Sequence, residues 1–103
     1  MPFLCINRLT VTGSGKDLKR WEAGGDWIQA AGGKYSELLE HSARRQAWQF
    51  ETAAPPLEYF KHLSTQWPRL IFIVEYDEQG RRVKGLAKMK AGKLEHYCVR
   101  YRV

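Results

Sequence analysis

Residues 69–103 read RLIFIVEYDEQGRRVKGLAKMKAGKLEHYCVRYRV, and this stretch decides the fold. It starts with the most strongly apolar run of the chain, Leu70 to Tyr76, which is typical of a central strand covered on both faces. Turn residues at 77–80 and at 91–92 then divide the stretch. We therefore predict a C-terminal meander of three antiparallel strands, at about 69–77, 81–90 and 93–103.

The last two of these strands alternate in character. In 81–90 the odd positions are apolar or small, and the even positions include the cations Arg82, Lys84, Lys88 and Lys90. In 93–103 the even positions include Arg100 and Arg102, and the odd positions are Tyr97, Val99, Tyr101 and Val103. Because successive side chains of a strand point to opposite faces, we predict that the odd positions of both strands face the core. The six cations are then expected to share one wet face.

The rest of the chain alternates between strand and helix signals. Residues 3–12 are rich in strand formers, and Ser14 followed by Asp17 is typical of a helix start. Gly24-Gly25 is expected to break or bend that helix, with a restart at Asp26 and an end at Gly32-Gly33. Further on, Trp48, Phe50 and Thr52 alternate with polar residues as in a half-buried strand. A second helix is predicted from Leu57 to Trp67, because its apolar residues recur at helical spacing and Pro68 follows.

Residues 34–44 are ambiguous, although Tyr35, Leu38 and Leu39 suggest a short helical turn. Taken together, the pattern predicts an α+β fold: an antiparallel sheet with two helices packed on one face. A chain of 103 residues is expected to form a single domain, 1–103.

The charge of the chain is unevenly distributed. Residues 81–103 hold eight Lys and Arg against one acid, Glu95, whereas residues 1–80 hold nine Lys and Arg against ten Asp and Glu. A polyanion or an acidic protein surface is therefore the expected partner. No apolar stretch is long enough to span a membrane, and the N-terminus lacks a signal-peptide pattern, so a cytoplasmic location in a host cell is expected. Cys5 and Cys98 are expected to be free, buried thiols, with a disulfide between them as the alternative.

The opening run PFLCINRLTVTG (Pro2–Gly13) resembles the PNWCxNxLTVTG start of the Api-like family, a group of uncharacterised proteins borne by phages and plasmids. Residues 50–85 are similar to the family's C-terminal half, with Pro55-Pro56 and the run Trp67-Pro68-Arg69-Leu70. Two departures are that Phe3-Leu4 stands in place of Asn-Trp and Ala53-Ala54 in place of an aromatic. The resemblance implies a ferredoxin-like domain carried on a mobile genetic element, and it supplies no catalytic residues.

Candidate chemistry elsewhere in the chain is sparse. Gly13-Ser14-Gly15-Lys16 lacks the spacing of a phosphate loop and is better explained as a strand-to-helix turn. Glu75 and Asp77 are expected to share a strand face. Paired carboxylates can act in acid–base catalysis, and the alternative is that they are solvated side chains beside a hairpin turn. His96 and Cys98 also share a face, as a nucleophile and its base would. None of these sets defines a reaction, so we expect no enzyme activity, no metal and no cofactor.

The basic face is the remaining candidate site, and its six cations are Arg82, Lys84, Lys88, Lys90, Arg100 and Arg102. A solvated sheet face is the simplest explanation for it. If it binds, the resemblance implies a non-enzymatic binding protein that inhibits or modulates a host machine, such as a CRISPR or other defence complex. The partner would then be an acidic host protein or a protein–nucleic acid complex. The alternative is a nucleic-acid-binding accessory protein that contacts phosphates through the same face.

Overall fold

The computed structural model describes residues 4–24 and 26–102. Six strands and three helices follow one another along the chain. They are β1 (Cys5–Thr12), α1 (Gly15–Ala23), α2 (Trp27–Ala30), β2 (Lys34–His41), β3 (Arg45–Thr52), α3 (Leu57–Gln66), β4 (Ile71–Glu78), β5 (Val83–Lys90) and β6 (Lys93–Arg100).

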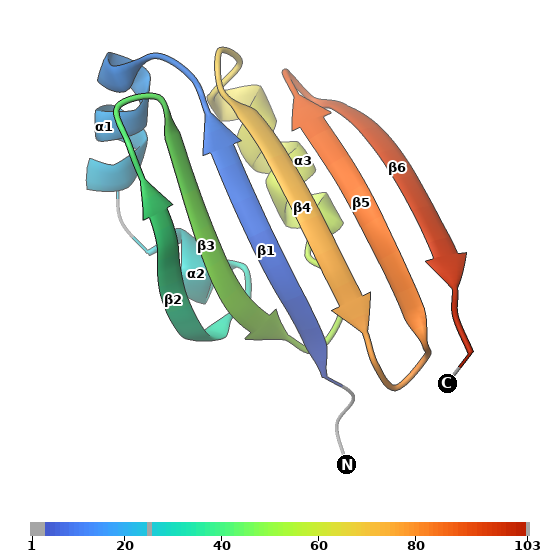
Figure 1. The fold of residues 1–103 in the computed structure, drawn as a ribbon. Helices are drawn as coiled ribbons and strands as arrows, with labels where there is room; N and C mark the ends of the chain where they lie inside the picture. The colour runs from blue at the N-terminus through green and yellow to red at the C-terminus, as the bar shows by residue number, and fades with distance from the viewer. Residues whose placement is uncertain (1–3, 25, 103) are drawn as a thin grey trace.

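The strands form one sheet in the order β2-β3-β1-β4-β5-β6, and every neighbouring pair is antiparallel. The last three strands lie side by side in chain order, whereas β1 is inserted between β3 and β4. All three helices lie behind the sheet in Figure 1, so one face carries helices and the other carries none of the described ones. The α+β prediction with an antiparallel sheet is confirmed, with a third short helix, α2, that was not counted separately.

Local signals explain where the helices begin. Ser14 caps α1, because its hydroxyl accepts the backbone N–H of Asp17 at 3.2 Å and donates to the Asp17 carboxylate at 2.8 Å. Arg69 donates to the same carboxylate at 3.0 Å and so ties the start of α1 to the residue that leads into β4. Gly24 follows α1 as its C-cap, while Gly25 lies outside the described residues.

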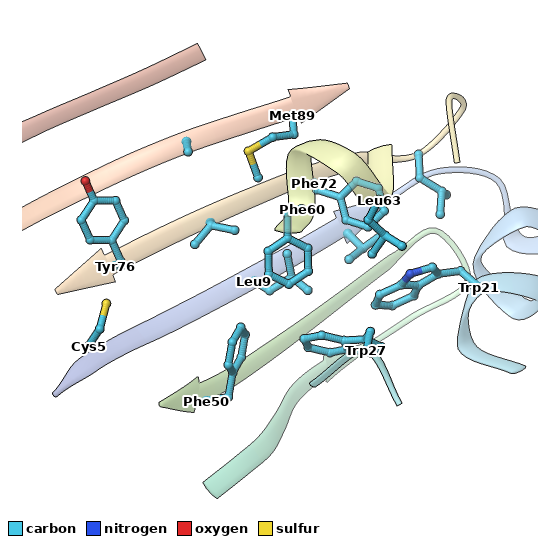
Figure 2. Packing of buried hydrophobic residues seen from close by; sticks show 14 of the residues in the cluster. Cys5, Leu9, Trp21, Trp27, Phe50, Phe60, Leu63, Phe72, Tyr76 and Met89 are labelled. Carbon is cyan, nitrogen blue, oxygen red and sulfur yellow. The ribbon is translucent and has the colours of Figure 1, made fainter. Parts of the chain in front are cut away.

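The core lies between the helices and the sheet, and Trp27 of α2 contacts several of its aromatic rings (Figure 2). The Trp27 ring stacks on Trp21 of α1 at 5.4 Å between ring centroids, and it meets Phe50 of β3 edge-on at 5.3 Å and Phe60 of α3 at 5.8 Å. Such aromatic contacts join α1, α2 and α3 to one another and to the sheet, so the high aromatic content stabilises the packing.

Three predictions about secondary structure were wrong. Residues 34–41 form strand β2 and not a helical turn, because pairing with β3 overrides the helical spacing of Leu38 and Leu39. Strand β4 is not covered on both faces: Phe72, Val74 and Tyr76 are buried under the helices, while Ile71, Ile73 and Glu75 lie on the other side. The turn before β5 comprises Gln79–Arg82, two residues later than the predicted 77–80, because β4 continues to Glu78.

Phe3 and Val103, which belong to the predicted first and last strands, lie outside the described residues. Cys5 is buried, as expected, but Cys98 is exposed, and both thiols are free. The described part of the chain contains no helix with the length and apolarity that a membrane crossing requires.

Candidate binding surface

The sheet face that carries no helices is called the uncovered face, and the strand register lays out its side chains in rows. Residues directly opposite each other in an antiparallel pair point to the same side of the sheet. Each row can therefore be followed from β2 to β6. In the strand order β2-β3-β1-β4-β5-β6, the first row is Lys34, Glu51, Ile6, Asp77, Lys84 and Val99. The second row is Glu37, Gln49, Arg8, Glu75, Leu86 and Tyr97. The third row is Glu40, Ala47, Thr10, Ile73, Lys88 and Glu95.

These rows correct the predicted orientation of β6. Arg100 is opposite Val83, a core residue, so Arg100 points to the helix-bearing side, whereas Lys84 and Lys88 point to the uncovered face. The predicted core positions Tyr97 and Val99 point to the uncovered face instead. The predicted face containing both Lys84 and Arg100 therefore does not exist.

The hairpin between β5 and β6 explains the inversion. Ala91 and Gly92 have φ angles of 51° and 83°, as both central residues of a two-residue type I′ turn require. Lys90 and Lys93 are consequently opposite each other. A two-residue turn pairs an even position with an odd one, so even residues of β5 share a face with odd residues of β6. The turn residues were visible in the sequence and carried this information.

The remaining predicted cations fall in different places. Lys90 points to the uncovered face beside the hairpin turn, because it follows Lys88 by two positions on the same strand. Arg82 lies in the turn before β5 with a φ of 54°. Arg102 is exposed and lies beyond the end of β6. The structure thus brings Lys84, Lys88 and Lys90 together and separates them from Arg100.

The uncovered face carries charges of both signs. Four cations and six acids occupy its three rows, and the next row adds the cations Arg45, Lys90 and Lys93. Asp77 of β4 is opposite Lys84, and Glu95 of β6 is opposite Lys88. The prediction counted charges along one segment of chain, whereas the field at a surface depends on neighbours in space.

An apolar patch, defined as Leu86, Tyr97 and Val99, lies on this face at β5 and β6. The three side chains are 44%, 68% and 66% exposed, and Leu86 is directly opposite Tyr97. Next to Leu86 the surface dips into a shallow hollow of about 480 Å³ lined by Ile6, Arg8, Glu75 and Lys84 among others. Exposed apolar side chains beside mixed charges are typical of protein-binding surfaces, and sequence reasoning missed these residues because it assigned Tyr97 and Val99 to the core.

Tyr101 adds a second aromatic ring beside the patch. Its hydroxyl donates to Oδ1 of Asp77 at 2.7 Å, and Nζ of Lys84 lies 5.1 Å from its ring centroid. The hydrogen bond to Asp77 raises the pKa of Tyr101. These contacts hold Lys84 beside a ring and a carboxylate, and all three groups belong to the uncovered face or its rim.

The helix-bearing side of β6 carries the other candidate pair, His96 and Cys98. Tyr76 of β4 shares a hydrogen bond of 2.6 Å between its hydroxyl and Nε2 of His96. Burial, foremost, and the neighbouring Cys98 raise the pKa of Tyr76 to about 12. The described hydrogen bond of the His96 imidazole is therefore with Tyr76, which orients the ring. In a thiol–base pair, the imidazole would instead bond to the Cys98 thiol.

Comparison of the chain with family models, with curated proteins and with solved structures gave no match.

Proposed function

We propose that this chain is a non-enzymatic binding protein of phage or plasmid origin that inhibits or modulates a host machine through its uncovered face. A CRISPR or other defence complex is the proposed class of target. The observation that carries the proposal is the apolar patch of Leu86, Tyr97 and Val99, which is exposed and bordered by Lys84, Lys88 and Glu75. An apolar centre with a charged rim is the usual anatomy of a protein interface.

The target inferred from this surface differs from a simple acidic partner. A matching protein surface offers an apolar centre, acids toward Lys84 and Lys88, and bases toward Glu75 and Asp77. Complementary charges of both signs favour the correct partner and register, and they speed association.

The origin and the fold family are part of the same proposal. The resemblance of Pro2–Gly13 and of residues 50–85 to the Api-like family supports the mobile-element origin. We infer further that residues 5–78 form a ferredoxin-like unit. Its support is the succession of a strand, a helical segment (α1 and α2), two strands, a helix and a strand, together with the order β2-β3-β1-β4. Strands β5 and β6 then extend that unit on one side and provide the whole apolar patch.

Phosphate binding is the second candidate function. It is favoured by the row of Lys84, Lys88 and Lys90 along β5 and by the exposed ring of Tyr97, on which a base can stack. The acids Asp77 and Glu95 opposite two of these lysines oppose it.

Paired charge reversals on the two sides of the sheet test the protein-binding proposal. K84E/K88E changes the uncovered face, and R100E is its matched control on the helix-bearing side. We expect the wild type and R100E to capture the same protein from a bacterial lysate after nuclease treatment, and K84E/K88E to lose it. Equal capture by the wild type and both variants would remove the uncovered face as the binding surface.

Salt separates the two candidates. Three lysine–phosphate contacts predict that affinity falls between 50 and 200 mM salt by about 40-fold for duplex DNA and about 18-fold for a single strand. A protein interface with an apolar centre is expected to lose much less, and Y97S/V99S is expected to weaken it at every salt concentration. Loss of capture after nuclease treatment, together with the steep salt slope, would instead establish the phosphate-binding function.

A further inference from the structure

Strand β6 is an edge of the sheet with a regular backbone. All eight of its residues pair with β5 without a register shift. The opposite edge, β2, is interrupted by register shifts between Lys34 and Glu37 and between Leu38 and Glu40, and its Tyr35 has a φ of 54°. Bulges of this kind discourage the addition of a further strand, whereas a regular edge is a template for one. Of the two edges, β6 is therefore the one suited to pairing.

The residues whose backbone groups face this edge can be identified. The N–H of Tyr101 donates to the carbonyl of Arg82 at 2.9 Å, so Tyr101 directs its backbone groups toward β5. In an antiparallel ladder this direction alternates along the strand. Odd residues of β6 therefore bond to β5, and Leu94, His96, Cys98 and Arg100 present their N–H and C=O groups outward.

The side chains around Cys98 are arranged symmetrically. Tyr97 and Val99 flank it on the uncovered face and are 68% and 66% exposed, and Cys98 itself is exposed on the other side. A second β6 that runs antiparallel about a twofold axis at Cys98 sets Tyr97 of each copy opposite Val99 of the other. The outward N–H and C=O groups of Cys98 in one chain then face the same groups of Cys98 in the other chain.

We propose that two copies of this chain pair through β6 in this register and form one continuous sheet. With Leu86 of each copy, the apolar patches merge into a strip of six side chains across the junction, and cross-strand apolar pairs of this kind stabilise a sheet. The twofold axis is perpendicular to the sheet, so the helices of both copies lie on the same side and the two uncovered faces become one. The inference does not depend on the proposed target.

The strand's own composition favours a second copy as the occupant. An axis at Tyr97 would set Glu95 opposite Val99 and Leu94 opposite Arg100. An axis at His96 would set Glu95 opposite Tyr97 and Lys93 opposite Val99. Only the axis at Cys98, among these three, matches apolar residues with apolar residues on the uncovered face. The same axis sets His96 opposite Arg100 and Glu95 opposite Tyr101, so the argument for a second copy is the paired contact of Tyr97 with Val99 on both sides of the axis. A foreign strand is the competing outcome of the test.

Sedimentation of the full chain from about 5 to 500 µM tests the pairing, since a small interface gives a concentration-dependent dimer. We expect the mass to approach twice 12.0 kDa as the concentration rises. C98P removes one outward N–H and places a ring at the edge, while the ladder to β5 is kept. It is expected to stay monomeric, and its matched control C98S is expected to dimerise like the wild type.

A second variant keeps the test decisive if C98P fails to fold. In Y97E/V99E the two new carboxylates of one copy face those of the other, while residue 99 stays opposite Lys84 of its own chain. This variant is expected to remain folded by circular dichroism and to be monomeric. A wild type that stays monomeric up to 500 µM would overturn the proposal, as would a C98P dimer.

A short bismaleimide reports the register. Each thiol adds across one maleimide double bond and nothing leaves, so a covalent dimer forms only where two accessible cysteines lie close together. The wild type and C5S are expected to give the covalent dimer, and C98S to give none, because Cys5 is fully buried. A wild-type dimer that the reagent fails to link would place the contact on another surface and refute the pairing at Cys98.

Discussion

Tyr76 of β4 lies over Gly85 of β5, in space that a side chain at residue 85 would fill. The ring crosses β5 above this glycine, and its hydroxyl reaches Nε2 of His96 on β6 at 2.6 Å. Glycine inside a strand often marks such a close approach. Gly85 is therefore a packing requirement, and Tyr76 joins three strands of the C-terminal half.

Gly85→Ala is expected to destabilise the fold by about 1–3 kcal/mol, because the added methyl group overlaps the Tyr76 ring. Urea unfolding of a double-mutant cycle measures the coupling. Tyr76→Leu removes the ring and is expected to reduce the cost of Gly85→Ala, whereas Tyr76→Phe keeps the ring and is expected to leave it unchanged. Additive effects of Gly85→Ala and Tyr76→Leu would contradict the overlap.

Alkaline pH is expected to weaken the fold through Tyr76. Its folded pKa is raised to about 12 from the ordinary value of 10, chiefly by burial. The folded state therefore holds this proton longer than the unfolded chain does. The stabilisation is complete below pH 10 and is lost as the pH rises toward 12, by up to roughly 1.4 kcal/mol per pH unit. Urea midpoints between pH 8 and 11.5 measure the slope, and Tyr76→Phe, which cannot ionise, is expected to show a shallower one.

Trp27→Ala is expected to cost about 3–5 kcal/mol of unfolding free energy, since it empties the contact point of Trp21, Phe50 and Phe60. Tyr35→Ala is the matched control. Its side chain is 79% exposed, so a change within about 0.5 kcal/mol is expected. Similar losses for both variants in chemical denaturation would be inconsistent with a core role for Trp27.

The two cysteines are expected to differ in reactivity toward a thiol reagent such as DTNB. Cys98 is exposed and should react in the native protein. Cys5 is fully buried, and burial raises the pKa of its thiol to about 11, so it should react only after unfolding. The native C98S variant should therefore release almost no chromophore. Rapid reaction of both thiols in native wild type would show that β1 opens readily.

The elements with strong local signals were predictable. The cap at Ser14, the helical spacing of 57–67 and the alternation around Phe50 each depend on neighbours a few residues away. Strand β2 was not predictable in this way, because residues 34–41 are extended only through pairing with β3. The position of β1 between β3 and β4 likewise depends on contacts between distant segments.

For the candidate site, the sequence by itself determined that β5 alternates between small or apolar and cationic side chains, and that a two-residue turn at Ala91-Gly92 follows it. Local backbone preferences and the two-residue period of a strand are sufficient for that. Only the tertiary structure decided which side chains of β6 lie on the uncovered, solvent-exposed face and which residues surround each lysine of β5. The charge of a surface is a sum over neighbouring strands, so the acids of β4 and β6 turned a basic segment into a mixed face with an apolar centre.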